Sequence, residues 1–311
     1  MHKHAITRPK IRRQLVDSPH GYIETRELGP TDIESDAECT PLLLVHSTPG
    51  AAASYDSFLP LLASRRRVVA ISSPGYGRSD RPSTPYTTLD EYARALAWGL
   101  DGLGIDQASV FGTQTGALLA IEFAVAYPQR TMKLVLEEPF HWGTPKRREA
   151  LLRTHSYVPA RADGSHLLAL WQRTHRHHER QRAQRRRVKS ALADTDLEPV
   201  GESILQTLAV NSAVGAEIYE GAGWLGAAPY AMGHYDTWTR VAEIRVPTLV
   251  IHGTMSQLGR SHERFVEVIP NARGLRLPSD GNFLPNQAPE LFAAELLAFL
   301  DEAVGTGAVE D

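Results

Sequence analysis

Gln114 is the residue whose position most suggests chemistry. It lies between Gly112 and Gly116, where an apolar run typical of a strand ends and a helical run from Ala117 to Ala126 begins. Glycines two residues on either side allow a sharp, strained turn that exposes the central side chain at the edge of a sheet. A glutamine amide donates and accepts hydrogen bonds, but it is not a useful nucleophile. The pattern therefore predicts a side chain that binds or orients a ligand.

Ionisable side chains follow several of the apolar runs. Glu138 comes directly after the run Met132–Glu137 and precedes a proline, so it is either an acid or base facing the turn or an ordinary polar residue that leads into a loop. His141 and His252 also lie at strand ends. A histidine there is more often packed and hydrogen-bonded than a base.

These side chains require a framework of alternating strands and helices. Strands are expected in residues 11–28, as a pair around a turn, and at 41–46, 68–71, 109–111, 132–137, 246–252 and 274–277. Helices are expected at 55–63, 89–103 after a Thr88 cap, 117–126 and 289–300. This alternation predicts an α/β fold with a mostly parallel sheet flanked by helices.

The strand rhythm stops between residues 140 and 239, where helical patterns and scattered aromatic residues take over. We interpret 140–239 as an inserted helical cap and 1–139 together with 240–311 as the core domain. Within the cap, residues 173–189 are rich in histidine and arginine. A solvated helix face explains this composition better than an anionic ligand or partner does. His175 and Glu179 could share a helical face, but two ligands make a poor metal site, so we expect no metal.

Composition limits the possible functions. The chain has 311 residues with 42% hydrophobic content, which is enough for a large core, and a formal net charge of -3 argues against binding to nucleic acid or to a membrane surface. One cysteine, Cys39, excludes an intramolecular disulfide. No apolar stretch has the length of a membrane span, and the basic N-terminus has no apolar segment behind it. We therefore expect a cytoplasmic protein.

Three motifs, in this order, resemble those of the α/β-hydrolase superfamily. Residues 46–49 resemble its H-G-x-P loop, residues 75–82 its G-x-G-x-S-x-x-P loop, and residues 112–116 its nucleophile elbow. The resemblance covers residues 11 to 303 and is strongest to the capped epoxide hydrolases and haloalkane dehalogenases. It implies an α/β-hydrolase fold with a helical cap.

The resemblance also implies where a catalytic triad would stand, and the residues there differ from the family pattern. The nucleophile position holds Gln114, the usual acid position holds Ser256, and the usual histidine position holds Asn282. Some haloalkane dehalogenases place the acid after the strand that follows the elbow, which corresponds to Glu138. Because a triad works as a unit, the loss of one member typically costs about 10⁴ to 10⁶ in turnover.

The family's oxyanion hole does not depend on side chains. Its backbone N–H donors would come from Thr115 and Thr48, and Gln114 would add a third hydrogen bond. Such donors stabilise an enolate or phenolate that develops on a carbonyl substrate. We therefore expect Gln114, Thr115, Thr48, Glu138 and Asn282 to form a catalytic set that needs no cofactor.

The expected substrate is a bulky small molecule of aromatic or polyketide-like character. Six further residues are expected to contact it: His46, Trp142, Tyr219, Trp224, Tyr230 and Ser256.

The resulting hypothesis is a non-hydrolytic, cofactor-independent enzyme of secondary metabolism. It would act on a polyketide or enediyne-type intermediate by cyclisation, by carbon–carbon bond formation of the aldol or Michael type, or by rearrangement. Two alternatives remain open from the sequence. One is a ligand-binding or scaffold protein without turnover, and the other is an atypical epoxide or ester hydrolase in which Glu138 activates water.

Overall fold

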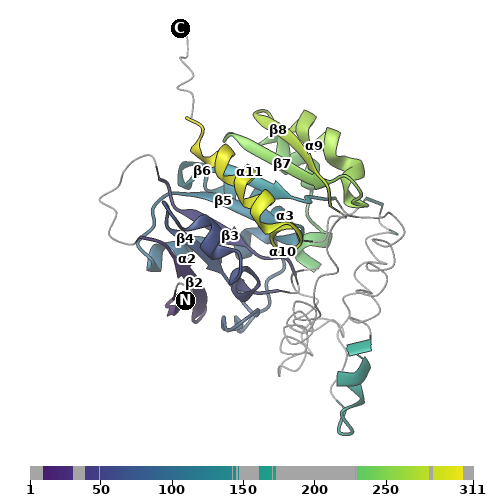
Figure 1. The fold of residues 1–311 in the computed structure, drawn as a ribbon. Helices are drawn as coiled ribbons and strands as arrows, with labels where there is room; N and C mark the ends of the chain where they lie inside the picture. Colours follow the sequence, from purple (N-terminus) through teal and green to yellow (C-terminus); the bar gives the residue numbers. More distant parts are fainter. Residues whose placement is uncertain are drawn as a thin grey trace, which may run out of the picture.

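Figure 1 shows the chain as a computed structural model with a central sheet and helices on both of its faces. The residues that the structure describes are 10–30, 39–48, 50–141, 143–144, 146, 161–169, 171–172, 228, 230–279 and 283–303. The statements that follow concern these residues.

One eight-stranded sheet forms the centre of the molecule, in the order β1-β2-β4-β3-β5-β6-β7-β8. Its strands are β1 (Arg12–Val16), β2 (Ile23–Leu28), β3 (Leu42–Val45), β4 (Val68–Ile71), β5 (Ala108–Thr113), β6 (Thr131–Glu137), β7 (Thr248–Gly253) and β8 (Ala272–Leu277). β2 pairs antiparallel with both β1 and β4, whereas the other neighbours are parallel. The predicted mostly parallel sheet is confirmed.

The central strands could be predicted from the sequence because they are buried. Every residue of β3, β4 and β5 is buried, because helices cover the sheet on both sides. Strands buried on both faces need continuous apolar side chains, so they appear as short runs of valine, leucine and isoleucine. β8, at the edge of the sheet, is mostly exposed and lacks such a run. It begins two residues before the predicted start.

The helices form two layers around the sheet (Figure 1). α2 (Leu89–Gly102), α3 (Thr115–Ala126), α8 (Thr237–Ala242) and α9 (His262–Val268) share one hydrophobic cluster. α1 (Leu59–Leu62), α10 (Leu284–Gln287) and α11 (Pro289–Asp301) share the other, together with the 3-10 helix η1 (Ala52–Tyr55). None of the helices in the described part of the chain is long and apolar enough to cross a membrane.

Two helices begin where the local sequence favours a helix N-terminus. The predicted Thr88 cap is confirmed, because its side chain accepts from Glu91 N–H while the Glu91 carboxylate accepts from the Thr88 N–H, which forms a capping box. The single helix predicted over 55–63 is wrong. η1 ends at Tyr55, and a new short helix starts at Leu59 with Pro60 in its first turn. Proline suits a helix start because it has no N–H to donate.

The segment that returns from the predicted cap is fixed to the core by an ion pair. Arg240 on α8 donates from Nε and Nη2 to the two carboxylate oxygens of Glu122 on α3, at 2.9 and 2.8 Å. Glu122 is buried, and paired donors of this kind hold a carboxylate in a fixed orientation. The division into core and cap remains a prediction, and its second boundary, between 239 and 240, falls inside α8.

Lys133 attaches the last helix to the sheet. Its ammonium group is buried at the start of β6 and donates to three carbonyl oxygens at the C-terminal end of α11: Phe299 at 2.8 Å, Leu300 at 3.0 Å and Glu302 at 2.5 Å. The last carbonyl groups of a helix have no partner inside the helix and carry partial negative charge. A cation therefore stabilises this end, although burial lowers the Lys133 pKa.

Replacing Lys133 with methionine is expected to lower the free energy of unfolding by about 2 kcal/mol, because it leaves these carbonyl groups without their charged donor. Arg273→Met is the matched control. Arg273 pairs with Glu302 at the same helix end, but both side chains are about half exposed, so its loss should cost under about 1 kcal/mol. Guanidinium unfolding of both variants measures the difference. Equal losses of unfolding free energy in the two variants would show that the buried hydrogen bonds of Lys133 contribute no more than the exposed ion pair of Arg273.

Candidate functional site

Gln114 lies at the corner between β5 and α3, in a backbone conformation with φ 49° and ψ -110°. Its N–H donates to Glu137 O at 2.7 Å, and its carbonyl accepts from the Ala117 N–H at 3.0 Å. The flanking glycines are required: an added Cβ would lie 2.3 Å from Gly116 O at Gly112, and 2.3 Å from Val45 O at Gly116. The predicted strained turn is confirmed.

The strain at this corner can be measured with two variants. Gln114→Gly and Gln114→Ala both remove the amide, but only glycine adopts a positive φ without steric cost. We expect the glycine variant to unfold with a free energy about 1 kcal/mol higher than the alanine variant. Urea titration of the pair gives the difference. If alanine were equally stable, the corner would carry no strain to relieve.

Strained backbone gathers around this corner. Of the non-glycine residues in the described ranges, three have positive φ: Gln114 at 49°, Glu138 at 53° and Phe283 at 59°. Glu137 links the three positions. Its carbonyl oxygen accepts from the Gln114 N–H, it directly precedes Glu138, and its carboxylate accepts from the Leu284 N–H at 2.5 Å. Such outliers persist where the surrounding structure holds them, which is common at functional sites.

Glu137 is a feature that the sequence analysis missed. Its side chain is completely buried, and burial raises its pKa from 4.5 to about 8, although the Leu284 N–H favours the charged form. Successive strand residues point to opposite faces of a sheet, so two adjacent glutamates at a strand end must occupy different environments. That alternation was the available signal.

The two acid positions implied by the resemblance meet in the structure. Glu138 follows β6 as predicted, and Ser256 lies in the loop after β7. Ser256 Oγ donates to Glu138 Oε2 at 2.5 Å, and the Gly253 N–H donates to Oε1 at 2.5 Å. Glu138 is fully buried, and both of its oxygens accept hydrogen bonds. The Ser256 hydroxyl also accepts from the Leu258 N–H, so it joins this loop to β6.

Thr48 and Thr115, the two residues expected to supply the oxyanion donors, are in contact, and one of the two donors already has an acceptor. Thr48 N–H donates to Thr115 Oγ1 at 2.5 Å, so this amide is already used inside the protein. Thr115 is the first residue of α3, and its own N–H has no acceptor within the helix because of that position. Gln114, Thr115 and Thr48 are all partly exposed. The structure thus groups three of the five predicted catalytic residues.

His46 shapes the loop that carries Thr48. Its ring is buried, with Nδ1 2.8 Å from Ser47 O and Nε2 2.9 Å from Ser73 N. The Ser73 N–H can only donate, so Nε2 accepts and Nδ1 carries the proton. Burial lowers the His46 pKa to about 4, so the ring is neutral near pH 7. Both ring nitrogens thus have partners inside the protein, and the expected contact of His46 with a substrate stays a prediction.

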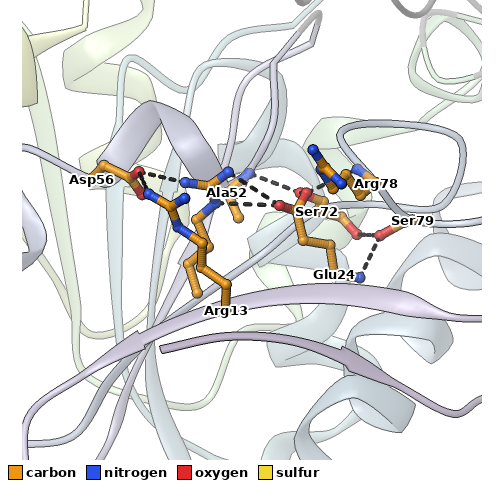
Figure 2. A network of polar contacts seen from close by, with 8 residues as sticks. Arg13, Glu24, Ala52, Asp56, Ser72, Arg78 and Ser79 are labelled. Carbon is orange, nitrogen blue, oxygen red and sulfur yellow. Dashed lines mark hydrogen bonds and ion pairs between the residues drawn. The ribbon is translucent and has the colours of Figure 1, made fainter. Parts of the chain in front are cut away.

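A buried carboxylate on β2, Glu24, organises the loop after β4 (Figure 2). Its Oε2 accepts from Ser72 Oγ at 2.8 Å and from Arg78 N at 2.9 Å, and a Cβ on Gly77 would lie 2.4 Å from the same oxygen. Ser79 Oγ accepts from Glu24 N at 2.9 Å and donates to Ser72 O at 2.6 Å. The glycine and serine of the motif at 75–82 therefore serve a structural network.

Tyr230 and His252 have ring partners other than Gln114, Thr115 and Thr48. Tyr230 is 38% exposed, and its ring lies 4.3 Å from that of His234, so its contact with a ligand remains a prediction. His252 is buried, and its ring nitrogens lie 3.0 Å from His262 Nδ1 and 3.0 Å from Pro139 O. Burial lowers the His252 pKa to about 4, which suits a packed residue.

Four predicted site residues lie outside the described residues: Asn282, Trp142, Tyr219 and Trp224. The basic segment 173–189 does as well. Within the described part of the chain, no group of three or more histidine, cysteine, aspartate or glutamate side chains is arranged to hold a metal ion.

The strand order, the strained corner after β5 and the loops around it are those of an α/β hydrolase. The family model described as "alpha/beta hydrolase fold" matches residues 40–285, and the chain belongs to this family. The fold class predicted from the three motifs is therefore confirmed.

Several curated relatives match about a third of the chain. A 2-hydroxy-6-oxo-2,4-heptadienoate hydrolase from Pseudomonas putida is 33% identical over 34% of this chain and 40% of its own length. A 2-hydroxymuconate semialdehyde hydrolase from a Pseudomonas species is 34% identical over 34% of this chain and 38% of its own length. A 2-hydroxy-6-oxononadienedioate/2-hydroxy-6-oxononatrienedioate hydrolase from Pseudomonas putida is 39% identical over 35% of this chain and 39% of its own length. The chain thus spans about two fifths of these relatives.

Solved structures match over nearly the whole chain at low identity. A hydrolase from Pseudomonas aeruginosa superimposes with a TM-score of 0.68 and 23% identity, covering 93% of this chain and 98% of that one. An enol-lactonase from Burkholderia xenovorans superimposes with a TM-score of 0.65 and 18% identity, covering 93% of this chain and 100% of that one. At these identities the likeness establishes the fold alone.

Proposed function

We propose that the chain is a non-hydrolytic enzyme that acts on a carbonyl compound without forming a covalent bond to it. The observation that carries this proposal is Gln114, which occupies the strained, partly exposed corner at φ 49° with a side chain that cannot attack a carbonyl carbon. The turn is kept while the nucleophile is not. A glutamine there can orient a substrate through its amide and leave the carbonyl group chemically intact.

The contacts of Glu138 argue against the alternative in which this residue activates water. A general base needs an accessible oxygen within hydrogen-bond reach of the proton that it removes. Glu138 is fully buried, and both of its oxygens accept hydrogen bonds from its own protein, from Gly253 and Ser256. These bonds make Glu138 a fixed support for the loop after β7.

Catalysis would rest on hydrogen-bond donors aimed at one oxygen of the substrate. The Thr115 N–H lies at the start of α3, directly after Gln114 at the same partly exposed corner, and the N-terminus of a helix favours negative charge. One well-placed donor stabilises a developing oxyanion by roughly 3 to 4 kcal/mol. Donors of this kind would lower the barrier to enolate formation, which is shared by cyclisation, aldol or Michael-type bond formation and rearrangement.

The relatives support a conjugated oxo compound as the substrate class. The substrates named for two of them carry a hydroxyl and a ketone on an unsaturated chain, which is a system that forms enolates. For this chain we propose a bulkier compound of the same reactivity, with aromatic or polyketide-like character, including the enediyne-type intermediates of secondary metabolism. No step of the proposed reaction requires a cofactor.

The test starts from the compound that accumulates when the gene is deleted in its source organism. That compound is incubated with the purified protein in ¹⁸O-labelled water, and the products are followed by mass spectrometry. An isomer of unchanged mass, or a coupled product without ¹⁸O from the solvent, is expected. A product heavier by one labelled water, or fragments that together gain it, would establish hydrolysis and overturn the proposal. Tight binding of an unchanged compound would instead favour a scaffold.

Gln114→Ala is the matched variant for the same assay, because it removes the amide and keeps the turn. We expect its turnover of the accumulated compound to fall about tenfold or more if the amide orients the reacting group. Undiminished turnover would remove Gln114 from the mechanism.

A further inference from the structure

The bond between Thr48 and Thr115 has a fixed direction. A backbone N–H has a proton to give and no lone pair to offer, so at the 2.5 Å contact the Thr115 hydroxyl oxygen must accept. A hydroxyl that accepts keeps its own proton for another partner. Among the described residues, no other hydrogen bond involves the Thr115 hydroxyl, and the residue is partly exposed at the corner beside Gln114.

We propose that the Thr115 hydroxyl, and not the Thr48 N–H, is a donor to the substrate oxygen at this site. The Thr48 N–H acts through it, since a donated hydrogen bond polarises the hydroxyl and strengthens the bond that its proton can make. The ligand that fits is a planar oxyanion, an enolate or a phenolate. This inference rests on the proposed function and assigns one of its donors.

The position of the hydroxyl explains how a hydrolase-type corner takes a ligand that is not covalently attached. An oxygen bound directly by Thr48 N–H would lie where the Thr115 hydroxyl now lies. With the hydroxyl in between, the ligand oxygen is displaced outward by the length of one O–H···O bond, about 2.7 Å. The hydroxyl therefore keeps the ligand oxygen farther from the corner than a direct bond to the Thr48 N–H would.

The donor is also held rigidly. Thr115 is fixed by its place in the first turn of α3, and Gly116 next to it touches the backbone of β3. On the other side, the two hydrogen bonds of the His46 ring to Ser47 and Ser73 hold the loop that carries Thr48. A donor fixed before the ligand arrives needs no reorganisation, which is the condition for effective oxyanion stabilisation.

Binding of 4-nitrophenolate tests the assignment, because this anion mimics the proposed enolate and its absorption changes when its oxygen is hydrogen-bonded. We expect Thr115→Val to weaken binding about tenfold or more and Thr115→Ser to stay within about threefold of the wild type. Thr131→Val is the matched control. It also removes a threonine hydroxyl, one that donates to Tyr127 O at 3.1 Å far from the corner, and should leave binding unchanged.

A second readout separates donation from a purely structural role of the hydroxyl. A series of substituted phenols gives the dependence of affinity on phenol acidity, and loss of a donor flattens this dependence, whereas a looser loop does not. Thr115→Ala repeats the test if the valine variant fails to fold.

Unchanged affinity and slope in the Thr115 variants would overturn the inference, since Thr48 N–H would then bind the ligand directly. The proposed function would survive that result, because it is judged separately by the mass of the product. If the wild-type chain bound no phenolate at all, the oxygen-binding corner itself would be refuted.

Discussion

At pH 9, Glu137→Gln is expected to raise the free energy of unfolding by several kcal/mol over the wild-type chain, while at pH 5 the two proteins should differ little. Burial holds the Glu137 carboxyl in its neutral form, with a pKa of about 8 in the folded chain against 4.5 for an ordinary glutamate. Glutamine keeps an oxygen that can accept from the Leu284 N–H, and it carries no charge at any pH.

The direction follows from proton binding. Between pH 4.5 and 8 the folded chain keeps the Glu137 proton and the unfolded chain releases it, so the wild type loses stability as pH rises through this range. The neighbouring Glu138 adds to the effect, and the buried Tyr55 nearby has its own pKa raised by burial and by Glu137. The full difference in pKa corresponds to on the order of 5 kcal/mol, at about 1.4 kcal/mol for each pH unit.

Guanidinium unfolding of wild type, Glu137→Gln and Glu290→Gln from pH 5 to 9 measures this dependence. Glu290 is exposed at the start of α11, so its replacement should leave the pH profile of the wild type unchanged. A Glu137→Gln profile parallel to that of the wild type would mean that Glu137 is already ionised in the folded chain at neutral pH.

Gly116→Ala is expected to destabilise the fold by at least about 3 kcal/mol, and the variant should accumulate poorly as a folded protein. A Cβ at this position would lie 2.3 Å from Val45 O and 2.5 Å from His46 O, and both atoms belong to backbone that cannot move aside independently. Overpacking of a rigid site costs about 1 to 3 kcal/mol or more. Relief would require α3 to move away from β3, which would disturb the corner at Gln114.

Gly104→Ala separates this contact from a general cost of replacing glycine. Gly104 has φ 64°, and an added Cβ would meet nothing within 4 Å, so alanine there suffers only the backbone penalty of about 1 kcal/mol. Thermal unfolding of both variants compares the two costs. Similar losses at the two sites would show that α3 adapts to the added methyl group.

The corner was predictable because its requirements are local. Two glycines at fixed spacing around Gln114, with a strand before them and a helix after them, leave few other backbone paths. The buried runs that became β3 and β4 were predictable for the same reason, since burial on both faces leaves a continuous apolar signature. Glu138 was placed correctly because the resemblance indicated the end of the strand after the elbow.

The contacts that define the roles at the corner were not predictable from spacing. Thr48 and Thr115 are 67 residues apart and meet only because β3 and β5 are neighbours in the sheet, although they are not consecutive strands. Ser256 and Glu138 are 118 residues apart and meet in the same way across β6 and β7. A sequence shows that such side chains exist. Which hydrogen bond each makes depends on the strand order, and so does the burial that raises the pKa of Glu137.

The contacts of Lys133 have a consequence for the synthesis of this protein. The three carbonyl oxygens that accept from its ammonium group lie 166 to 169 residues later in the chain. A growing chain can therefore assemble the neighbourhood of β6 long before it contains the partners of this buried cation. A product that stopped before residue 299 would leave that charge without its partners in the middle of the sheet, so a truncated chain should be a substrate for proteolysis.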